Sequence, residues 1–454
     1  MLEELPETLD ETYERILRDI NKANRDHAHR LLQCLTVAVR PLRVPELAEV
    51  LAVDFGTGPR GDSSRLNTDW RWEDQQEAVL STCSSLISVV GEDGGQVVQF
   101  SHFSVKEFLT SSRIGGSSID VSRFHILLEP AHTVVSKACL GVLVRLGELV
   151  DEGNVKDMFP LARYAAKHWV EHARFENVSS HIRDGMEDIF DPDKPYFAAW
   201  LQVHDIDVYS AESTLFWFGS SSLKDSNTGT PLYYAALCGF YYLAEQLIIK
   251  HPLQVNATGG YYVSPLGAAL SRGHLKIAQL LYDHGADLDV QGHYNYTPLY
   301  SASWTGNLEI AQWLLTRGAN SNACGKTFLW TPLHAATDIQ HVEISRLLLQ
   351  YKANICAYDN EGRAPLHVAA QFGRFEVTQL LLEHGADVNA RYNSCNTPLH
   401  WASMRGDLDT ARLLVEHGAN IDAEDENGRT ASYLASKNGH PDLVKFLSDC
   451  CGSK

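Results

Sequence analysis

The feature that most constrains this chain is a motif that recurs at a nearly constant interval through its C-terminal half. The dipeptide Thr-Pro or a close variant occurs seven times, with successive copies 33 or 34 residues apart, beginning at Thr230, Ser264, Thr297, Thr331, Ala364, Thr397 and Thr430. Self-similarity at a period of about 20 to 50 residues is typical of proteins built from stacked structural units. The interval therefore predicts a solenoid rather than one compact core.

The segment 364–390, A-P-L-H-V-A-A-Q-F-G-R-F-E-V-T-Q-L-L-L-E-H-G-A-D-V-N-A, shows what one unit contains. Pro365 fits the first turn of a helix, and Gly373 fits the left-handed cap that ends it. A second helix over 375–383 has one broad apolar face, formed by Val377, Leu380, Leu381 and Leu382. Two short helices cannot bury such a face alone, so neighbouring units must stack.

The repeated words T-P-L-H and H-G-A-D at this period resemble ankyrin repeats over residues 225–449. The resemblance implies a mainly α-helical solenoid of about seven repeats whose concave face holds partner proteins. The first and last units depart from the pattern, as expected of units that meet solvent on one side.

The N-terminal part has a different pattern. Thr8 and Glu11 are spaced as a capping box before a helix over 5–22, and further helices are expected over 27–39, 45–53 and 73–85. The runs 86–90 and 96–100 flank a Gly-rich turn and predict a hairpin. Helices followed by one hairpin indicate a winged-helix fold.

Two strings in this part, L-P-E-T-L-D-E-T-Y-E-R-I-L and F-S-H-F-S-V-K-E-F-L, resemble the winged-helix segment that follows the NACHT domain in fungal ankyrin-bearing NTPases of the NOD-like type. We therefore predict a winged-helix domain at 1–118, a helical spacer at 119–224 and the ankyrin domain at 225–449. The resemblance also implies that His102 is a remnant of a nucleotide-sensing contact, whereas a structural histidine is the plainer interpretation. The phosphate-binding loop G-x-x-x-x-G-K-[ST] is missing, because Gly325-Lys326-Thr327 has Asn320 where the first glycine is required.

Composition limits the classes of partner that this chain is expected to bind. The formal charge is -19, so nucleic acid and anionic membranes are not expected, and Glu46, Glu49, Glu73, Asp74 and Glu77 would repel phosphates from the winged helix. Nine scattered cysteines form no C-x-x-C pair, and neither a leader nor a membrane span is evident.

We expect a cytoplasmic protein, with the nucleus left open, that uses no cofactor, metal or small-molecule substrate and is not an enzyme. The recurring histidines, among them His334, His367 and His400, are expected to be structural.

The informative positions are those that the repeat leaves free: the hairpin tip before each Thr-Pro and the residues just before the mid-unit glycine. They carry large apolar side chains, namely Tyr261, Tyr262, Tyr294, Tyr296, Phe328 and Trp330 at the tips and Trp304, Ile339, Phe372 and Met404 at the helix ends. Tyrosine and tryptophan dominate binding hot spots, so we interpret this set as a partner-binding face. The alternative is that the rings pack against neighbouring hairpins.

The sequence thus predicts a scaffold or adaptor that binds a protein, of basic character, through its concave ankyrin face. The alternative function is the sensor half of a NACHT-type switch in innate immunity or self/non-self recognition, with the NTPase part absent or on another chain.

Overall fold

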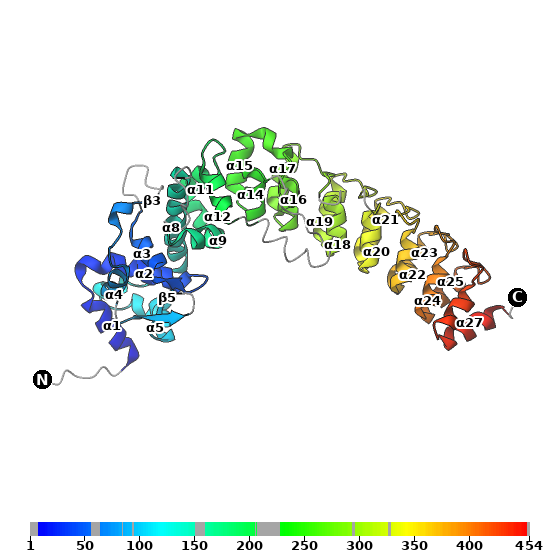
Figure 1. The fold of residues 1–454 in the computed structure, drawn as a ribbon, viewed down its shortest axis with the longest axis horizontal. Coiled ribbons are helices and arrows are strands. Elements are labelled where there is room, and N and C mark those ends of the chain that lie inside the picture. The colour runs from blue at the N-terminus through cyan, green and yellow to red at the C-terminus, as the bar shows by residue number, and fades with distance from the viewer. Residues whose placement is uncertain are drawn as a thin grey trace. The chain divides into compact units, whose positions relative to one another are not determined.

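A computed structural model describes residues 8–55, 64–83, 85–92, 95–149, 159–204, 206, 228–292, 296–325 and 328–451. The chain divides into two compact units, one of residues 1–223 with 242–246 and the other of 224–241 with 247–454. Figure 1 shows that both are mostly helical. Each unit is described by itself.

The first part of the N-terminal unit is a winged helix. Its helices are α1 (Leu9–Asp19), α2 (Arg25–Val37), α3 (Val44–Leu51), α4 (Gln75–Cys83), α5 (Phe103–Thr110), α6 (Ser112–Gly115) and α7 (Ile119–Ser122), with short 3₁₀ turns at Lys22–Asn24 and Thr68–Trp70. The predicted hairpin is confirmed as β4 (Ile87–Glu92) and β5 (Gly95–Phe100), in which Val89 is opposite Val98. The capping box is also confirmed, because the Glu11 amide donates to Thr8 Oγ1 and the Thr8 amide donates to Glu11 Oε2, each at 3.2 Å.

Three short strands were not predicted. Strand β1 (Leu42–Arg43) pairs with β5 to complete a sheet in the order β1-β5-β4, and β2 (Val53–Asp54) pairs with β3 (Arg65–Leu66). Each has two residues, too few to produce a periodic pattern in the sequence.

The prediction that Glu46 and Glu49 repel phosphates from the surface of the winged helix is wrong. Glu46 and Glu49 were expected to face outward, but both are only 3% exposed. Arg40 binds the Glu46 carboxylate with both terminal nitrogens at 2.6 and 2.8 Å, and Arg71 pairs with Glu49, which also accepts from the Leu161 amide at 2.7 Å. Burial outweighs these partners and raises the pKa of Glu49. These two buried carboxylates therefore stabilise the fold and are not presented to an external phosphate.

Helices α8 (Leu128–Glu148), α9 (Ala162–Ala173), α10 (Val178–His181), α11 (Arg183–Phe190) and α12 (Tyr196–Val203) complete this unit. Their core is aromatic: the Trp169 and Trp200 rings meet edge to face at 5.4 Å, and the Trp200 indole N–H donates to the Ala166 carbonyl at 2.9 Å. Because α8 also packs on α2 and β3, these helices and the winged helix share one packed body.

The C-terminal unit confirms the predicted solenoid. From Pro231 onward the described residues form seven successive helix pairs, with residues 242–246 of α15 assigned to the N-terminal unit. The pairs are α14 (Pro231–Cys238) and α15 (Tyr241–Lys250), α16 (Pro265–Ser271) and α17 (Leu275–Asp283), α18 (Pro298–Thr305) and α19 (Leu308–Thr316), α20 (Pro332–Asp338) and α21 (Val342–Gln350), α22 (Pro365–Phe372) and α23 (Phe375–Glu383), α24 (Pro398–Arg405) and α25 (Leu408–Glu416), α26 (Ala431–Lys437) and α27 (Pro441–Cys451). A 3₁₀ turn at Pro252–Asn256 follows the first pair.

Successive first helices pack on one another from α14 to α26, and second helices do so from α19 to α27, so the unit has two layers (Figure 1). The spacing that predicted the second helix of the fifth unit is confirmed by α23, whose Val377, Leu380, Leu381 and Leu382 are all buried. Gly373 ends α22 at φ 66°, the left-handed conformation that glycine adopts without strain.

Candidate partner-binding face

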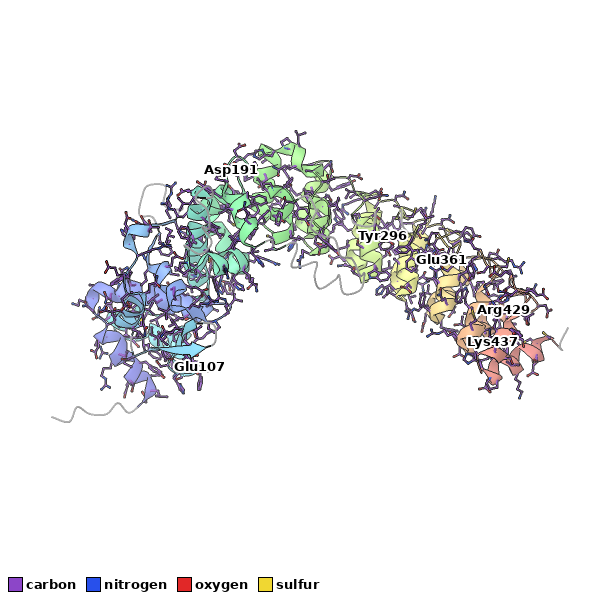
Figure 2. The ribbon with its side chains drawn as sticks, in the orientation of Figure 1. Glu107, Asp191, Tyr296, Glu361, Arg429 and Lys437 are labelled. Carbon is purple, nitrogen blue, oxygen red and sulfur yellow. The ribbon has the colours of Figure 1, made fainter. Side chains whose placement is uncertain are left out.

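Repetition aligns equivalent positions of neighbouring units into rows. The residue before each Thr-Pro forms what we call the tip row, which from the second unit onward consists of Val263, Tyr296, Trp330, Arg363, Asn396 and Arg429. The residue two places before the mid-unit turn forms the helix-end row, which from the third unit onward consists of Trp304, Asp338, Gln371, Met404 and Lys437. From the third unit onward the tip row changes from aromatic to charged or polar side chains, whereas the helix-end row is mixed. Figure 2 shows Tyr296, Glu361 and Arg429 in that order along the helix pairs.

The third and fourth units bring four aromatic rings together, which we call the aromatic stack: Tyr296, Tyr300, Trp304 and Trp330. The Tyr296 and Tyr300 rings lie 3.8 Å apart and 7° from parallel. Tyr300 and Trp304 are 6.4 Å apart, and Trp304 and Trp330 are 6.3 Å apart. Tyr300 is buried, whereas the other three rings are partly exposed. The rings therefore pack on one another while three of them still present surface, and binding of a partner remains a prediction.

Trp330 is held in orientation by the next hairpin. Its indole N–H donates to Asp359 Oδ2 at 3.2 Å. Asp359 is itself fixed, because Oδ1 accepts from the amides of Glu361 and Arg363 at 2.9 and 2.8 Å and Oδ2 accepts from Arg363 Nε at 2.9 Å. A side chain locked in this way loses little conformational entropy when a partner covers it.

The same arrangement recurs in the last hairpin, where Asp425 binds the Asn427 and Arg429 amides and the Arg429 side chain. Burial alone would raise the pKa of Asp425, but the Arg429 amide and guanidinium outweigh it and lower the pKa. This motif was not predicted, although the string D-x-x-G-R occurs at residues 359–363 and 425–429.

The remaining predicted residues are distributed along the solenoid. Phe328 and Ile339 are 47% and 38% exposed, and the neighbouring Leu329, which was not predicted, is 40% exposed. Phe372 and Met404 are half-buried on the fifth and sixth units. Tyr261 and Tyr262 meet edge to face at 5.0 Å on the second unit, and Tyr294 lies outside the described residues.

Asp338 is a further residue of this face that the sequence analysis missed. It ends α20 in the helix-end row and is half-buried, and within the described part of the chain its carboxylate makes no hydrogen bond or ion pair. Burial raises its pKa, while Arg374 and Arg363 act in the opposite direction. Burial also raises the pKa of Tyr300, and Tyr296 and the charge of Asp338 add to that shift. The sequence signal for Asp338 was its position next to Trp304 in the helix-end row.

The Thr-Pro-Leu-His histidines have structural contacts. In the fifth unit the Ala364 amide donates to Nδ1 of His367 at 3.1 Å, so the proton resides on Nε2, which faces the Ala390 carbonyl at 2.9 Å. His334 and His400 bridge to the next hairpin in the same way. Burial lowers the pKa of His334 and of His367 to about 4.

His102 lies at the start of α5, apart from this face. Its Nδ1 accepts from the Ser104 amide at 3.3 Å and lies 2.6 Å from the Ser104 hydroxyl, which also contacts the Tyr13 hydroxyl. The exposed imidazole therefore serves as the helix N-cap, and a phosphate contact remains a prediction.

Comparison with known families identifies both parts. The family model "Ankyrin repeats (3 copies)" matches residues 232–324, 321–392 and 390–454. The model "GPI inositol-deacylase, winged helix domain" matches residues 14–120.

A curated relative, "Azaphilone pigments biosynthesis cluster protein L" from Monascus ruber, is 32% identical over 290 residues, which cover 61% of this chain and 59% of the relative. The chain therefore matches less than two thirds of that protein's length. In the described residues no helix is long and apolar enough to cross a membrane. The chain thus contains ankyrin repeats preceded by a winged helix domain of the GPI inositol-deacylase type.

Proposed function

We propose that this protein is a non-enzymatic scaffold or adaptor that binds a partner protein through the concave face of its ankyrin repeats. The observation that carries the proposal is the aromatic stack, in which the buried Tyr300 links Tyr296 to Trp304 and Trp304 contacts Trp330. Three of these rings are partly exposed, and Trp330 donates a hydrogen bond to Asp359. Exposed Phe328, Leu329 and Ile339 extend the apolar area in the same two units. Preordered aromatic side chains are the residues that most often dominate binding energy.

The test is capture of partners by the full chain from its native source, followed by binding measurements with the purified captured protein. Replacing Tyr296, Trp304 or Trp330 by alanine is expected to weaken binding by about 2 kcal/mol each, because each change removes a large anchoring ring. Tyr433→Ala is the matched control, since this ring is 53% exposed on the last repeat, away from the aromatic stack. Equal affinity of the stack variants and the control would contradict the proposal.

A second candidate function is the sensor half of a NACHT-type switch, and the match of residues 14–120 to a winged helix domain supports it. Mapping the complete transcript would test it, because an in-frame phosphate-binding loop upstream would favour the switch. His102→Asn is a useful variant, since asparagine can still cap α5 while the imidazole is removed. Loss of nucleotide-dependent regulation with an unchanged fold would support the sensing role.

A further inference from the structure

We infer that Asp338, together with the indole rings of Trp304 and Trp330, forms a binding site for an arginine side chain of the partner protein. This inference rests on the proposed function and names the chemistry by which the face recognises its partner. The site joins two adjacent repeats, since Trp304 lies in the last turn of α18, Trp330 precedes α20 and Asp338 ends α20.

The position of Asp338 is set by the repeat. It takes the same place in the fourth unit that Trp304 takes in the third and Gln371 takes in the fifth, so a carboxylate follows an indole along one row. The side chain is half-buried, and among the residues that the structure describes neither a hydrogen bond nor an ion pair satisfies it. A partly desolvated carboxylate gains strongly from a cation that replaces its lost water.

Two arginines act on the pKa of this carboxylate, but neither forms an ion pair with it among the described residues. The Arg363 guanidinium is engaged by Asp359 at 2.9 Å and Gln371 at 3.0 Å, and it lies 3.4 Å from Glu361. The guanidinium carbon of Arg374 lies 6.0 Å from the Phe372 ring centroid, and no ion pair within the described ranges joins Arg374 to Asp338. Both arginines act on Asp338 only through space.

Arginine fits this combination of groups better than lysine does. Its planar guanidinium can stack on an indole and at the same time donate two hydrogen bonds to one carboxylate. It is also less strongly hydrated than an ammonium group, so entry into a half-buried site costs less. The two indole centroids lie 6.3 Å apart with their planes at 49°. A guanidinium is attracted to the electron-rich face of such a ring.

The experiment uses the full chain labelled with 5-fluorotryptophan and titrated with N-acetyl-arginine amide. Trp304→Phe and Trp330→Phe assign the two ¹⁹F resonances, and the uncharged citrulline analogue is the shape control. We expect both resonances to shift with arginine and not with citrulline. Asp338→Asn should weaken the binding by about tenfold, the usual effect of losing a charged hydrogen-bond partner. Glu343→Gln removes the same charge from a 70% exposed side chain on the second-layer helix α21 and should change nothing.

Shifts of equal size with citrulline, or equal affinities of Asp338→Asn and Glu343→Gln, would overturn the inference. Binding measurements with the purified partner distinguish failure of the arginine site from failure of the proposed function. If Trp304→Ala weakens partner binding and Asp338→Asn does not, the binding face stands and the arginine site fails. If neither change weakens it, the proposed function fails as well.

Discussion

At the scale of single residues, much of this structure depends on polar groups that are satisfied inside the fold. His367 lies 0% exposed between Ala364 and Ala390, with one ring nitrogen accepting and the other donating. Protonating Nδ1 would place two N–H groups against each other and would charge a buried ring. The neutral tautomer is therefore part of the packing between units.

This burial predicts a stability that depends on pH. The pKa of His334 and of His367 is lowered to about 4 in the folded chain, so the unfolded chain binds more protons between about pH 6.5 and 4. The free energy of unfolding is therefore highest above about pH 6.5. It falls as the pH is lowered from about 6.5 to 4, by up to about 1.4 kcal/mol per pH unit for each histidine.

Urea unfolding at several pH values in this range should show a shallower pH dependence for His367→Gln than for the wild type. His417→Gln, which changes an exposed histidine, should match the wild type. A solenoid that became more stable on acidification, or an unchanged slope in His367→Gln, would contradict this account.

Residue-level features that depend on local spacing could be predicted from the sequence. The Thr8–Glu11 capping box and the cap at Gly373 are examples, since each is defined within a few residues. The contact of Trp304 with Trp330 and the burial of Glu46 could not be predicted, because both depend on how separate segments meet in space.

At the scale of elements, the hairpins contribute to stability and, under the proposed function, also to recognition. The two D-x-x-G-R hairpins have the same internal bonds, but only Asp359 also accepts from a tryptophan of the preceding hairpin. The sequence predicted where the hairpins and helices lie, since periodicity and glycines mark them. It did not predict β1, whose two residues are fixed only by pairing with β5.

The two hairpins form a matched pair for mutation. Asp359→Asn and Asp425→Asn should each destabilise the solenoid by about 2 kcal/mol, because each leaves a hairpin arginine without its buried charge partner. Only Asp359→Asn should weaken partner binding, since only that change frees the Trp330 ring. Chemical unfolding and affinity measurements on both variants check this, and equal losses of affinity would show that the orientation of Trp330 is irrelevant.

At the scale of the whole molecule, each repeat contacts only its neighbours. The free energy of unfolding that a cavity costs therefore depends on the position of its repeat in the solenoid. Leu381 and Leu447 are equivalent positions in the fifth and seventh units, and both are 0% exposed. Leu381→Ala should cost about 3 kcal/mol, because two neighbours lose packing, whereas Leu447→Ala should cost less and mainly fray the last unit. Urea unfolding followed by circular dichroism, with hydrogen exchange to locate the fraying, measures both effects, and equal costs would contradict nearest-neighbour stacking.

The mainly helical fold class and the order of winged helix before solenoid could be predicted, because the family motifs and the 33-residue period extend over long stretches of the sequence. The chemistry of the binding face could be predicted only in part. The aromatic positions were visible as departures from the repeat, but the half-burial of Asp338, on which its proposed role depends, could not be predicted from its position in the row alone.

The most direct test of the central claim is hydrogen–deuterium exchange of the full chain with and without the purified partner. The account predicts protection in segments 296–305 and 328–339, which carry the aromatic stack and Asp338, and no change in the hairpin at 425–429. Protection confined to the second-layer helices α19, α21 and α23, or to the winged helix, would contradict it.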